Sequence, residues 1–405
     1  MPSSRRVGSS RSVYRARRMS TGLRLLLALV VLAGAGTLAA LQLSKSPPRS
    51  VAPPPPACTV HGVLATWSLA RLADETIVVP AEETDVLAIV PAARTGYGGV
   101  ILFGTAAPSD LGSQLAQLRS EIPGRLGLLV MTDEEGGGIQ RMANLVGSMP
   151  WPSQMGSTMS PGQITALARR VGTKMAAFGV NVDLAPVLDV DGRAVEPGAA
   201  DPDGFRSFSG DLGTVETDGV AFLKGLIDAD IVPVVKHFPG LGGATGNTDD
   251  APADTLPWTT LQSAALPAFQ AAIKAGAPAV MVSNAIVPGL SGVDPASLSR
   301  AVVTRVLRVK LGFRGLIITD SLSAKAISDA PLSLTVPEAS AKALEAGDDM
   351  VLYGPSGSVS TDLDTAAAIR TAILAAVAAG QLSRTQLIRA AAEVLAAKSV
   401  RLCPS

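Results

Sequence analysis

A lysine and a histidine stand side by side at the end of a β-branched run, and a glycine-rich polar loop follows them. They are Lys236 and His237, which open the run KHFPGLGGATGNTDD at 236–250. An ammonium and an imidazole at the exit of a strand can bind and orient a polar ligand. A second run, GLIITDSLSAKAI at 315–327, ends an apolar strand pattern with Asp320. A carboxylate held there is a candidate for catalysis, and the alternative is an N-cap for the next helix.

Strand-like and helix-like patterns alternate through the rest of the chain. Strands are predicted at 76–79, 99–103, 126–132, 181–184, 232–236, 279–282, 315–319 and 350–353, and amphipathic helices include 261–275 and 365–379. No glycine-rich dinucleotide fingerprint follows the first strand. The pattern therefore favours an α/β fold of the (β/α)8 TIM-barrel type, in a single domain, over a doubly wound sheet.

Polar side chains gather at the predicted carboxyl ends of these strands, where the active site of such a barrel lies. They are Asp133, Glu134, Glu135, Asp183, Asp189, Lys236, His237, Asn284 and Asp320. One carboxylate there is explained by helix capping. So many at one rim are better explained by a polar ligand.

The first 57 residues predict export. Residues 1–24 contain seven Arg and no acid, and 25–43 contain no charge, which is close to the length that crosses a bilayer. By the positive-inside rule the amino terminus stays in the cytoplasm, and the chain beyond residue 43 is secreted or membrane-anchored; a cleaved signal and an anchor both fit. A proline-rich linker at 44–57 then leads to the barrel domain at 58–405.

The formal net charge of zero hides a basic tail and an acidic domain, because the chain from residue 51 onward has 25 bases against 34 acids. A nucleic-acid partner is disfavoured by that balance. Two His and two Cys make a Cys/His metal centre improbable, so neither a metal nor another cofactor is expected. In an oxidising compartment Cys58 and Cys403 suggest a disulfide that joins the domain's ends, and two unpaired thiols are the alternative.

The motifs taken together resemble the single-domain branch of glycoside hydrolase family 3, the bacterial β-N-acetylglucosaminidases of cell-wall turnover. The resemblance rests on DEEGGGIQR (133–141), NVDLAPVLDV (181–190), FRSFSGD (205–211), KHFPGLG (236–242), PASLS (295–299), LGFRGLIITDSL (311–322) and AGDDM (346–350). It implies that Asp320 is the nucleophile of a retaining hydrolysis. It also implies that the sugar is bound by Asp133, Arg141, Arg206, Lys236 and His237.

The sequence departs from that family where the proton donor should stand. The family continues to an Asp-Ser-His whose His is the acid/base, whereas ungapped counting places Asn247, Thr248 and Asp249 there. Three explanations remain open. Asp249, with a pKa raised by burial or by a neighbour such as Asp250, acts as acid/base; or the enzyme is slow; or the protein only binds glycans.

Two smaller departures concern the sugar that is recognised. Gly138 stands where the family usually has an Arg, and Asn284 where a His is common. The chain has only 14 aromatic residues, which fits a pocket for one terminal sugar better than a long stacking cleft. The expected function is a metal-free, exo-acting β-N-acetylhexosaminidase for β-linked amino-sugar glycans, and a glycan-binding protein on a degenerate barrel is the alternative.

Overall fold

Eight parallel strands form the centre of a computed structural model that describes residues 58–403 apart from residue 330. They are β1 (Ile77–Glu82), β2 (Gly99–Phe103), β3 (Leu129–Thr132), β6 (Val182–Asp183), β7 (Val232–Phe238), β8 (Ala279–Val282), β9 (Leu316–Thr319) and β10 (Val351–Leu352). Their order is β10-β1-β2-β3-β6-β7-β8-β9, and a parallel bridge between Ile318 and Met350 joins the two ends. The ring is closed, so the predicted (β/α)8 barrel is confirmed.

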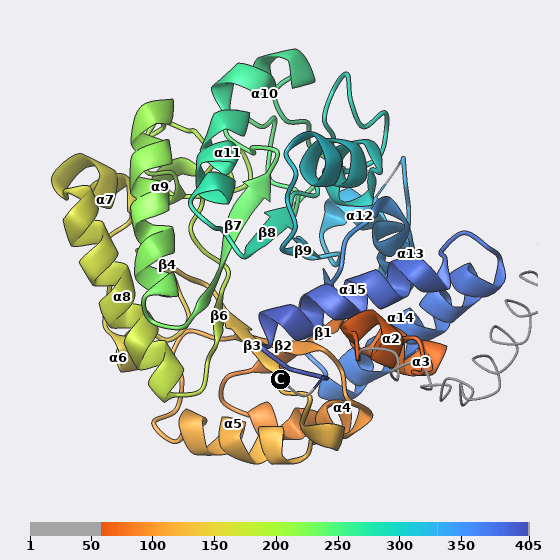
Figure 1. The fold of residues 1–405 in the computed structure, drawn as a ribbon. Coiled ribbons are helices and arrows are strands. Elements are labelled where there is room, and N and C mark those ends of the chain that lie inside the picture. Colours follow the sequence, from red (N-terminus) through yellow and green to blue (C-terminus); the bar gives the residue numbers. More distant parts are fainter. Residues whose placement is uncertain (1–57, 330, 404–405) are drawn as a thin grey trace, which may run out of the picture. The chain divides into compact units, whose positions relative to one another are not determined.

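Helices surround this ring (Figure 1). They are α2 (Val60–Leu64), α3 (Leu69–Asp74), α4 (Val90–Thr95), α5 (Leu111–Ser120), α6 (Ala143–Val146), α7 (Pro152–Thr158), α8 (Pro161–Ala177), α9 (Leu212–Ile227), α10 (Trp258–Ala264), α11 (Leu266–Lys274), α12 (Lys325–Ser328), α13 (Val336–Ala346), α14 (Val359–Ala378) and α15 (Arg384–Ala397). A π-helix (Ala301–Lys310) and four short 3₁₀ segments (Val86–Ile89, Pro123–Arg125, Gly204–Arg206, Ala296–Leu298) complete the set. A small hairpin of β4 (Glu134–Gly136) and β5 (Ile139–Gln140) follows β3.

The predicted strands agree with the structure to within a few residues. The largest differences are three residues, at the end of β1, which continues to Glu82, and at the start of β3. β3 begins at Leu129 instead of 126 because Gly127 has a left-handed φ of 70° that a strand does not accommodate. The helix predicted at 261–275 is wrong as a single element. Ala265 leaves the helical conformation, and Pro267 near the start of α11 has no N–H to continue the helical hydrogen bonds, so α10 and α11 are separate.

Alternation along the strands builds two apolar layers. Val78, Ile101 and Met131 point inward, where they form the inner cluster of the barrel, while Val79 and Leu102 point outward to the helices. Because both faces of the parallel sheet are covered, successive side chains of a strand are apolar, and each strand appears in the sequence as a continuous apolar run. The packed interior leaves only the rim at the carboxyl ends for a polar site.

The two ends of the domain are joined by a disulfide. Cys58 and Cys403 are bonded, with their Cα atoms 5.6 Å apart, and residues from Cys58 onward form one compact unit. The predicted basic tail (1–24), transmembrane or signal segment (25–43) and linker (44–57) lie outside the described residues. Within the part of the chain that is described, no helix is long and apolar enough to cross a membrane.

Candidate active site

A cavity of about 310 Å³ opens at the carboxyl ends of the strands. Its lining includes every residue predicted for catalysis or sugar binding, namely Asp133, Arg141, Arg206, Lys236, His237, Asp249 and Asp320. Asp133 follows β3, Lys236 and His237 belong to β7, and Asp320 directly follows β9. Residues separated by almost two hundred positions therefore meet because parallel strands end at one rim.

Glu135, which the sequence did not single out as a binding residue, is the centre of a buried ion-pair network. Its carboxylate accepts hydrogen bonds from Nε and Nη2 of Arg206, both at 2.8 Å, and lies 2.7 Å from Nζ of Lys236. Burial by itself raises the pKa of Glu135, but the positive charges of Arg206 and Lys236 outweigh it and hold that pKa below its ordinary value. Glu135 is therefore ionised, and it fixes two of the predicted sugar contacts.

Lys236 also holds Asp133. Its Nζ donates to Oδ1 of Asp133 at 2.8 Å, and Arg141 approaches the other oxygen of the same carboxylate at 3.7 Å. Burial opposes the charge of Lys236, yet Asp133 and Glu135 together raise the pKa of the ammonium. Alternating carboxylates and cations give a sugar both acceptors and donors with fixed positions.

Glu134 takes no part in this network, although it lies between Asp133 and Glu135 in the chain. Strand-like alternation turns it to the other side, where it accepts from Nε2 of Gln140 at 2.9 Å and from the backbone N–H of Met142. Burial raises the pKa of Glu134 to about 7, and these hydrogen bonds oppose the shift. Glu134 supports the β4–β5 hairpin and does not line the cavity.

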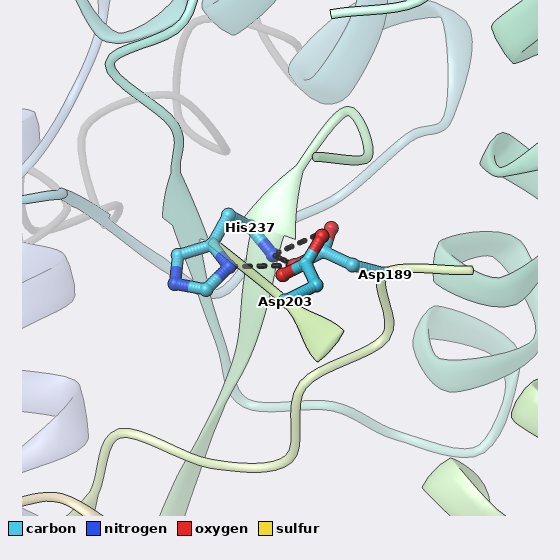
Figure 2. A group of neighbouring side chains, drawn as sticks. All are labelled: Asp189, Asp203 and His237. Carbon is cyan, nitrogen blue, oxygen red and sulfur yellow. Dashed lines mark hydrogen bonds and ion pairs between the residues drawn. The ribbon is translucent and has the colours of Figure 1, made fainter. Parts of the chain in front are cut away.

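His237 is oriented from behind by Asp189 (Figure 2). Its Nδ1 lies 2.6 Å from Oδ2 of Asp189, and its Nε2 lies 3.3 Å from Nη2 of Arg206. A guanidinium nitrogen only donates, so Nε2 must accept and Nδ1 must carry the hydrogen that is donated to Asp189. These contacts fit an imidazole with hydrogen on Nδ1, whose Nε2 accepts from Arg206 at the wall of the cavity.

Asp203 lies beside this pair. Oxygen and nitrogen atoms of Asp189, Asp203 and His237 lie within 4.8 Å of one another, and all three side chains are buried. Among the described residues, these three side chains are the group of His, Cys, Asp or Glu that lie close enough together to hold a metal ion.

Asp320 is anchored by the barrel itself. Its backbone N–H donates to the carbonyl of Val282 at the end of β8, and its Oδ1 accepts from the N–H of Ser321 at 2.7 Å. The next helix, α12, begins only at Lys325 and has Ala324 as its N-cap. Asp320 is therefore not a helix cap, which removes the structural alternative considered for it.

Asn284 braces the residue after Asp320. Its Nδ2 donates to the carbonyl of Ser321 at 2.7 Å, and its Oδ1 accepts from Oγ of Ser297 at 2.6 Å. Both Asn284 and Ser297 are fully buried. The side chain that stands in place of the family's usual His therefore links the ends of β8 and β9.

Asp249 lies on the loop after β7, and the charge of Arg206 in the same cavity only partly offsets what raises the pKa of Asp249. The backbone N–H of Asp249 donates to Oδ1 of Asn247 at 3.0 Å. The carbonyl of the preceding residue, Thr248, accepts a hydrogen bond from the N–H of Ala326. The side chain keeps contact with solvent, but burial by the cavity walls, followed by the charge of Asp320, raises the pKa of Asp249. Asp250 makes only a minor contribution to this shift.

Gly138 has no free space beside it. A Cβ there would come within 2.9 Å of the Trp151 ring, which also covers Gly137. Trp151 in turn lies 6.0 Å from the ring of Phe205, between centroids. An aromatic pair therefore packs where the sequence lacks the family's usual Arg.

Comparison with known proteins agrees with this geometry. Residues 84–397 match the sequence model of the Glycosyl hydrolase family 3 N terminal domain. The chain is 34% identical over 303 residues to Beta-hexosaminidase LpqI of Mycobacterium tuberculosis, covering 73% of this chain and 75% of that protein. It is 31% identical to an uncharacterized secreted glycosyl hydrolase of Arthroderma benhamiae, covering 75% and 84%. The crystal structure of a beta-N-acetylhexosaminidase from Beutenbergia cavernae superposes with a TM-score of 0.72 at 32% identity, covering 83% of this chain and all of the other.

Proposed function

The chain belongs to glycosyl hydrolase family 3 and is a glycoside hydrolase, and on that premise we propose that it is a retaining exo-glycosidase. Its proposed substrate is a terminal β-linked N-acetylglucosamine, or a related β-sugar, on a cell-wall-type glycan. The observation that carries the proposal is the convergence of Asp320, Asp249 and five sugar-binding candidates on one small cavity. The hexosaminidase names of the relatives support the choice of sugar.

The proposed reaction begins at Asp320. Its carboxylate attacks the anomeric carbon, and the bond from that carbon to the leaving oxygen breaks as the covalent glycosyl-enzyme forms. Asp249 gives its proton to the leaving oxygen from its protonated form, which burial and the charge of Asp320 favour because they raise its pKa. Asp249 then removes a proton from water, which attacks the anomeric carbon and releases Asp320, so the configuration is retained.

Binding of the sugar is assigned to the charged wall of the cavity. Asp133 is an acceptor for hydroxyl groups, while Arg141 and Lys236 donate to them. His237 is proposed to accept from a hydroxyl group that replaces Arg206 at its Nε2. Glu135 is proposed to act through Arg206 and Lys236 and not on the sugar, since it is fully buried and its three polar contacts are with these two cations.

The domain is proposed to work outside the cytoplasm. The Cys58–Cys403 disulfide supports this, because disulfides persist in oxidising compartments, and so does the secreted relative. A basic tail followed by an uncharged stretch of nineteen residues supplies the export signal. Whether that segment anchors the protein is tested by fractionating cells that express the full chain and a chain beginning at residue 51.

The test of the function is the release of nitrophenol from aryl β-glycosides. Wild type is expected to hydrolyse the N-acetylglucosaminide faster than the glucoside or the xyloside, and Asp320→Asn is expected to lose turnover. Asp329→Asn, an exposed carboxylate beyond α12, is the matched control and should retain activity. Sugar binding by calorimetry without turnover of any activated substrate would instead support the glycan-binding alternative. Full activity in Asp320→Asn would contradict the assignment of the nucleophile.

A further inference from the structure

Asp203 is a buried carboxyl group that the proposed reaction does not use. Its side chain is fully buried, and neither of its oxygens has a hydrogen-bond partner among the described residues. It precedes the 3₁₀ segment that carries Arg206, and in Figure 2 its carboxyl group lies next to Asp189 and the imidazole of His237. Such a group requires an explanation, because an ionised carboxylate without donors is costly to bury.

The surrounding charges do not supply a donor. Asp189 and Asp191 face Asp203 with like charge, and Arg206 is the cation that opposes them. Four of the five N–H hydrogens of Arg206 are directed elsewhere, two to Glu135, one to the carbonyl of Pro202 and one to His237. Arg193 is likewise engaged, by Asp191 and by Asp201. A proton or a metal cation must therefore balance the carboxyl group of Asp203.

A metal cation on these three side chains conflicts with the hydrogen bonds already made. Asp189 accepts from the backbone N–H groups of His237 and Leu241 in addition to Nδ1 of His237. A metal at Nδ1 would displace its hydrogen, and the neutral imidazole would then carry hydrogen on Nε2. That N–H would face Nη2 of Arg206 at 3.3 Å, so two donors would oppose each other.

A proton on Asp203 conflicts with nothing. A carboxylate has about four acceptor positions. Three N–H groups donate to Asp189, two from His237 and one from Leu241, and the backbone N–H of His237 is shared between both oxygens at 3.3 and 3.1 Å. Asp189 can therefore still accept from one O–H donor. An O–H group on Asp203 would be that donor and give the orphaned carboxyl group its partner.

We propose that Asp203 is a neutral carboxylic acid that donates a hydrogen bond to Asp189 and thereby keeps His237 in the neutral Nδ1–H form. Asp203 is then a positioning residue, which acts on the sugar cavity through Asp189 and His237. If Asp203 were ionised, two adjacent carboxylates would draw a second proton onto His237, and the acceptor that faces the cavity would be lost. Burial, followed by the charge of Asp189, raises the pKa of Asp203 well above its ordinary value, which agrees with this arrangement.

The protonation state can be read directly, without any activity assay. The chain has two His, and His61 is exposed on α2, so in a His61→Ala background the only imidazole signal is that of His237. Nitrogen-15 NMR at neutral pH is expected to show a neutral ring with hydrogen on Nδ1. A charged ring, or hydrogen on Nε2, would overturn the proposal.

Variants at position 203 test whether the side chain there donates a hydrogen bond to Asp189. Asp203→Asn keeps an N–H donor for Asp189 and should leave the His237 signal unchanged. Asp203→Leu removes the donor and makes the Asp189 carboxylate more basic, so hydrogen should be held on both nitrogens of the ring. The neighbouring Asp201→Asn is the control and should not alter His237. An unchanged signal in a folded Asp203→Leu, or an altered one in Asp203→Asn, would count against the proposal; if Asp203→Leu does not fold, Asp203→Asn and wild type still decide it.

Ligand binding completes the test. This part rests on the proposed function, since it takes His237 to contact the sugar. N-acetylglucosamine affinity should be unchanged in Asp203→Asn and about tenfold weaker in Asp203→Leu, the effect of one hydrogen bond to a polar ligand. Titration with Zn²⁺, Ca²⁺ and Mg²⁺ is expected to show no stoichiometric binding. Binding that is abolished by Asp203→Asn would establish a metal site instead. Because the NMR result does not depend on turnover, failure of this inference is distinct from failure of the glycosidase assignment.

Discussion

Glu135 and Arg206 face each other through two parallel hydrogen bonds of 2.8 Å, one from Nε and one from Nη2. This fork geometry fixes the guanidinium plane before any sugar is bound. Lys236 lies on the same carboxylate, so one buried acid organises two cations on one wall of the cavity. The wall is thus assembled in the absence of ligand, and little reorganisation is required when a sugar enters.

Removal of this acid should destabilise the fold. Glu135→Gln leaves Arg206 and Lys236 without their counter-charge, and breaking a buried pair in this way costs about 3–5 kcal/mol. Urea unfolding followed by circular dichroism measures the change. The matched control is Glu121→Gln, which breaks the exposed Arg94–Glu121 pair and should leave stability unchanged. Equal stability of Glu135→Gln and wild type would show that the network is not a stabilising element.

Asp249 should determine the alkaline limit of activity. A general acid must be protonated, so kcat/KM on poor leaving groups falls as pH rises through the raised pKa of Asp249. Asp249→Asn should lose about 10²–10⁴-fold on such substrates and much less on activated aryl glycosides. Asp249→His restores the family's residue and should move the alkaline limit to higher pH. A pH profile that is the same in Asp249→Asn and wild type would assign the proton transfer to another group.

Asn284 should affect the chemical step more than binding. Asn284→Ala leaves the Ser321 carbonyl and the Ser297 hydroxyl without partners in a buried region, which costs about 1–3 kcal/mol of stability. The loop that carries Asp320 then loses its brace, so kcat should fall about tenfold, since a small misplacement of a reacting group is costly. KM should change little. Ser297→Ala, which keeps the contact with Ser321, is the milder control; an equal kcat in Asn284→Ala and wild type refutes the bracing role.

Glu134 should make stability depend on pH. Its folded pKa of about 7 lies above the ordinary value of 4.5, so the folded state binds the proton more tightly than the unfolded state does. Stability from this group is complete below about pH 4.5 and is lost as pH rises through 7, a change of about 3 kcal/mol. The free energy of unfolding of Glu134→Gln, measured from pH 5 to pH 8, should have a shallower slope than that of wild type. Parallel slopes would mean that Glu134 stays ionised.

The disulfide should stabilise the domain by closing a very long loop. Cys58 and Cys403 are 345 residues apart, so in the chain-entropy description their bond restricts the unfolded state strongly, by about 2–5 kcal/mol. Reductant should lower the Tm of wild type to that of the double variant Cys58→Ser, Cys403→Ser. The double variant itself should not respond to reductant, and a Tm of wild type that is independent of reductant would contradict the prediction.

The barrel and its rim could be predicted from sequence because short apolar strands alternate with helices and several of the strands are followed by a polar residue. Placement at one rim then follows from topology, which is why Asp133, His237 and Asp320 were correctly expected to lie together. The departure from the family pattern at Asp249 could be located by counting along the sequence. The surroundings of the Asp249 side chain could not be predicted in this way. Asp320, more than Asp250, supplies the neighbouring charge.

Other features depend on which way a side chain turns, and composition does not reveal this. Three consecutive acids at 133–135 look equivalent in the sequence, yet Glu134 turns to the hairpin while Glu135 holds Lys236. Asp203 looks like an ordinary loop residue, and its complete burial depends on the path of the chain between β6 and α9. Pro267 lies within the predicted 261–275 helix, and the apolar periodicity of that stretch does not show that two helices meet there.

The disulfide and the cavity lie at opposite ends of the barrel. Just before Cys403, Lys398 pairs with Glu75 ahead of β1, and Val400 lies next to Gly127 ahead of β3, so this end of the chain lies at the amino ends of the strands. The cavity opens at the opposite pole. The disulfide therefore lies on the side of the domain that is turned away from the substrate, and it leaves the mouth of the cavity unobstructed for incoming glycan.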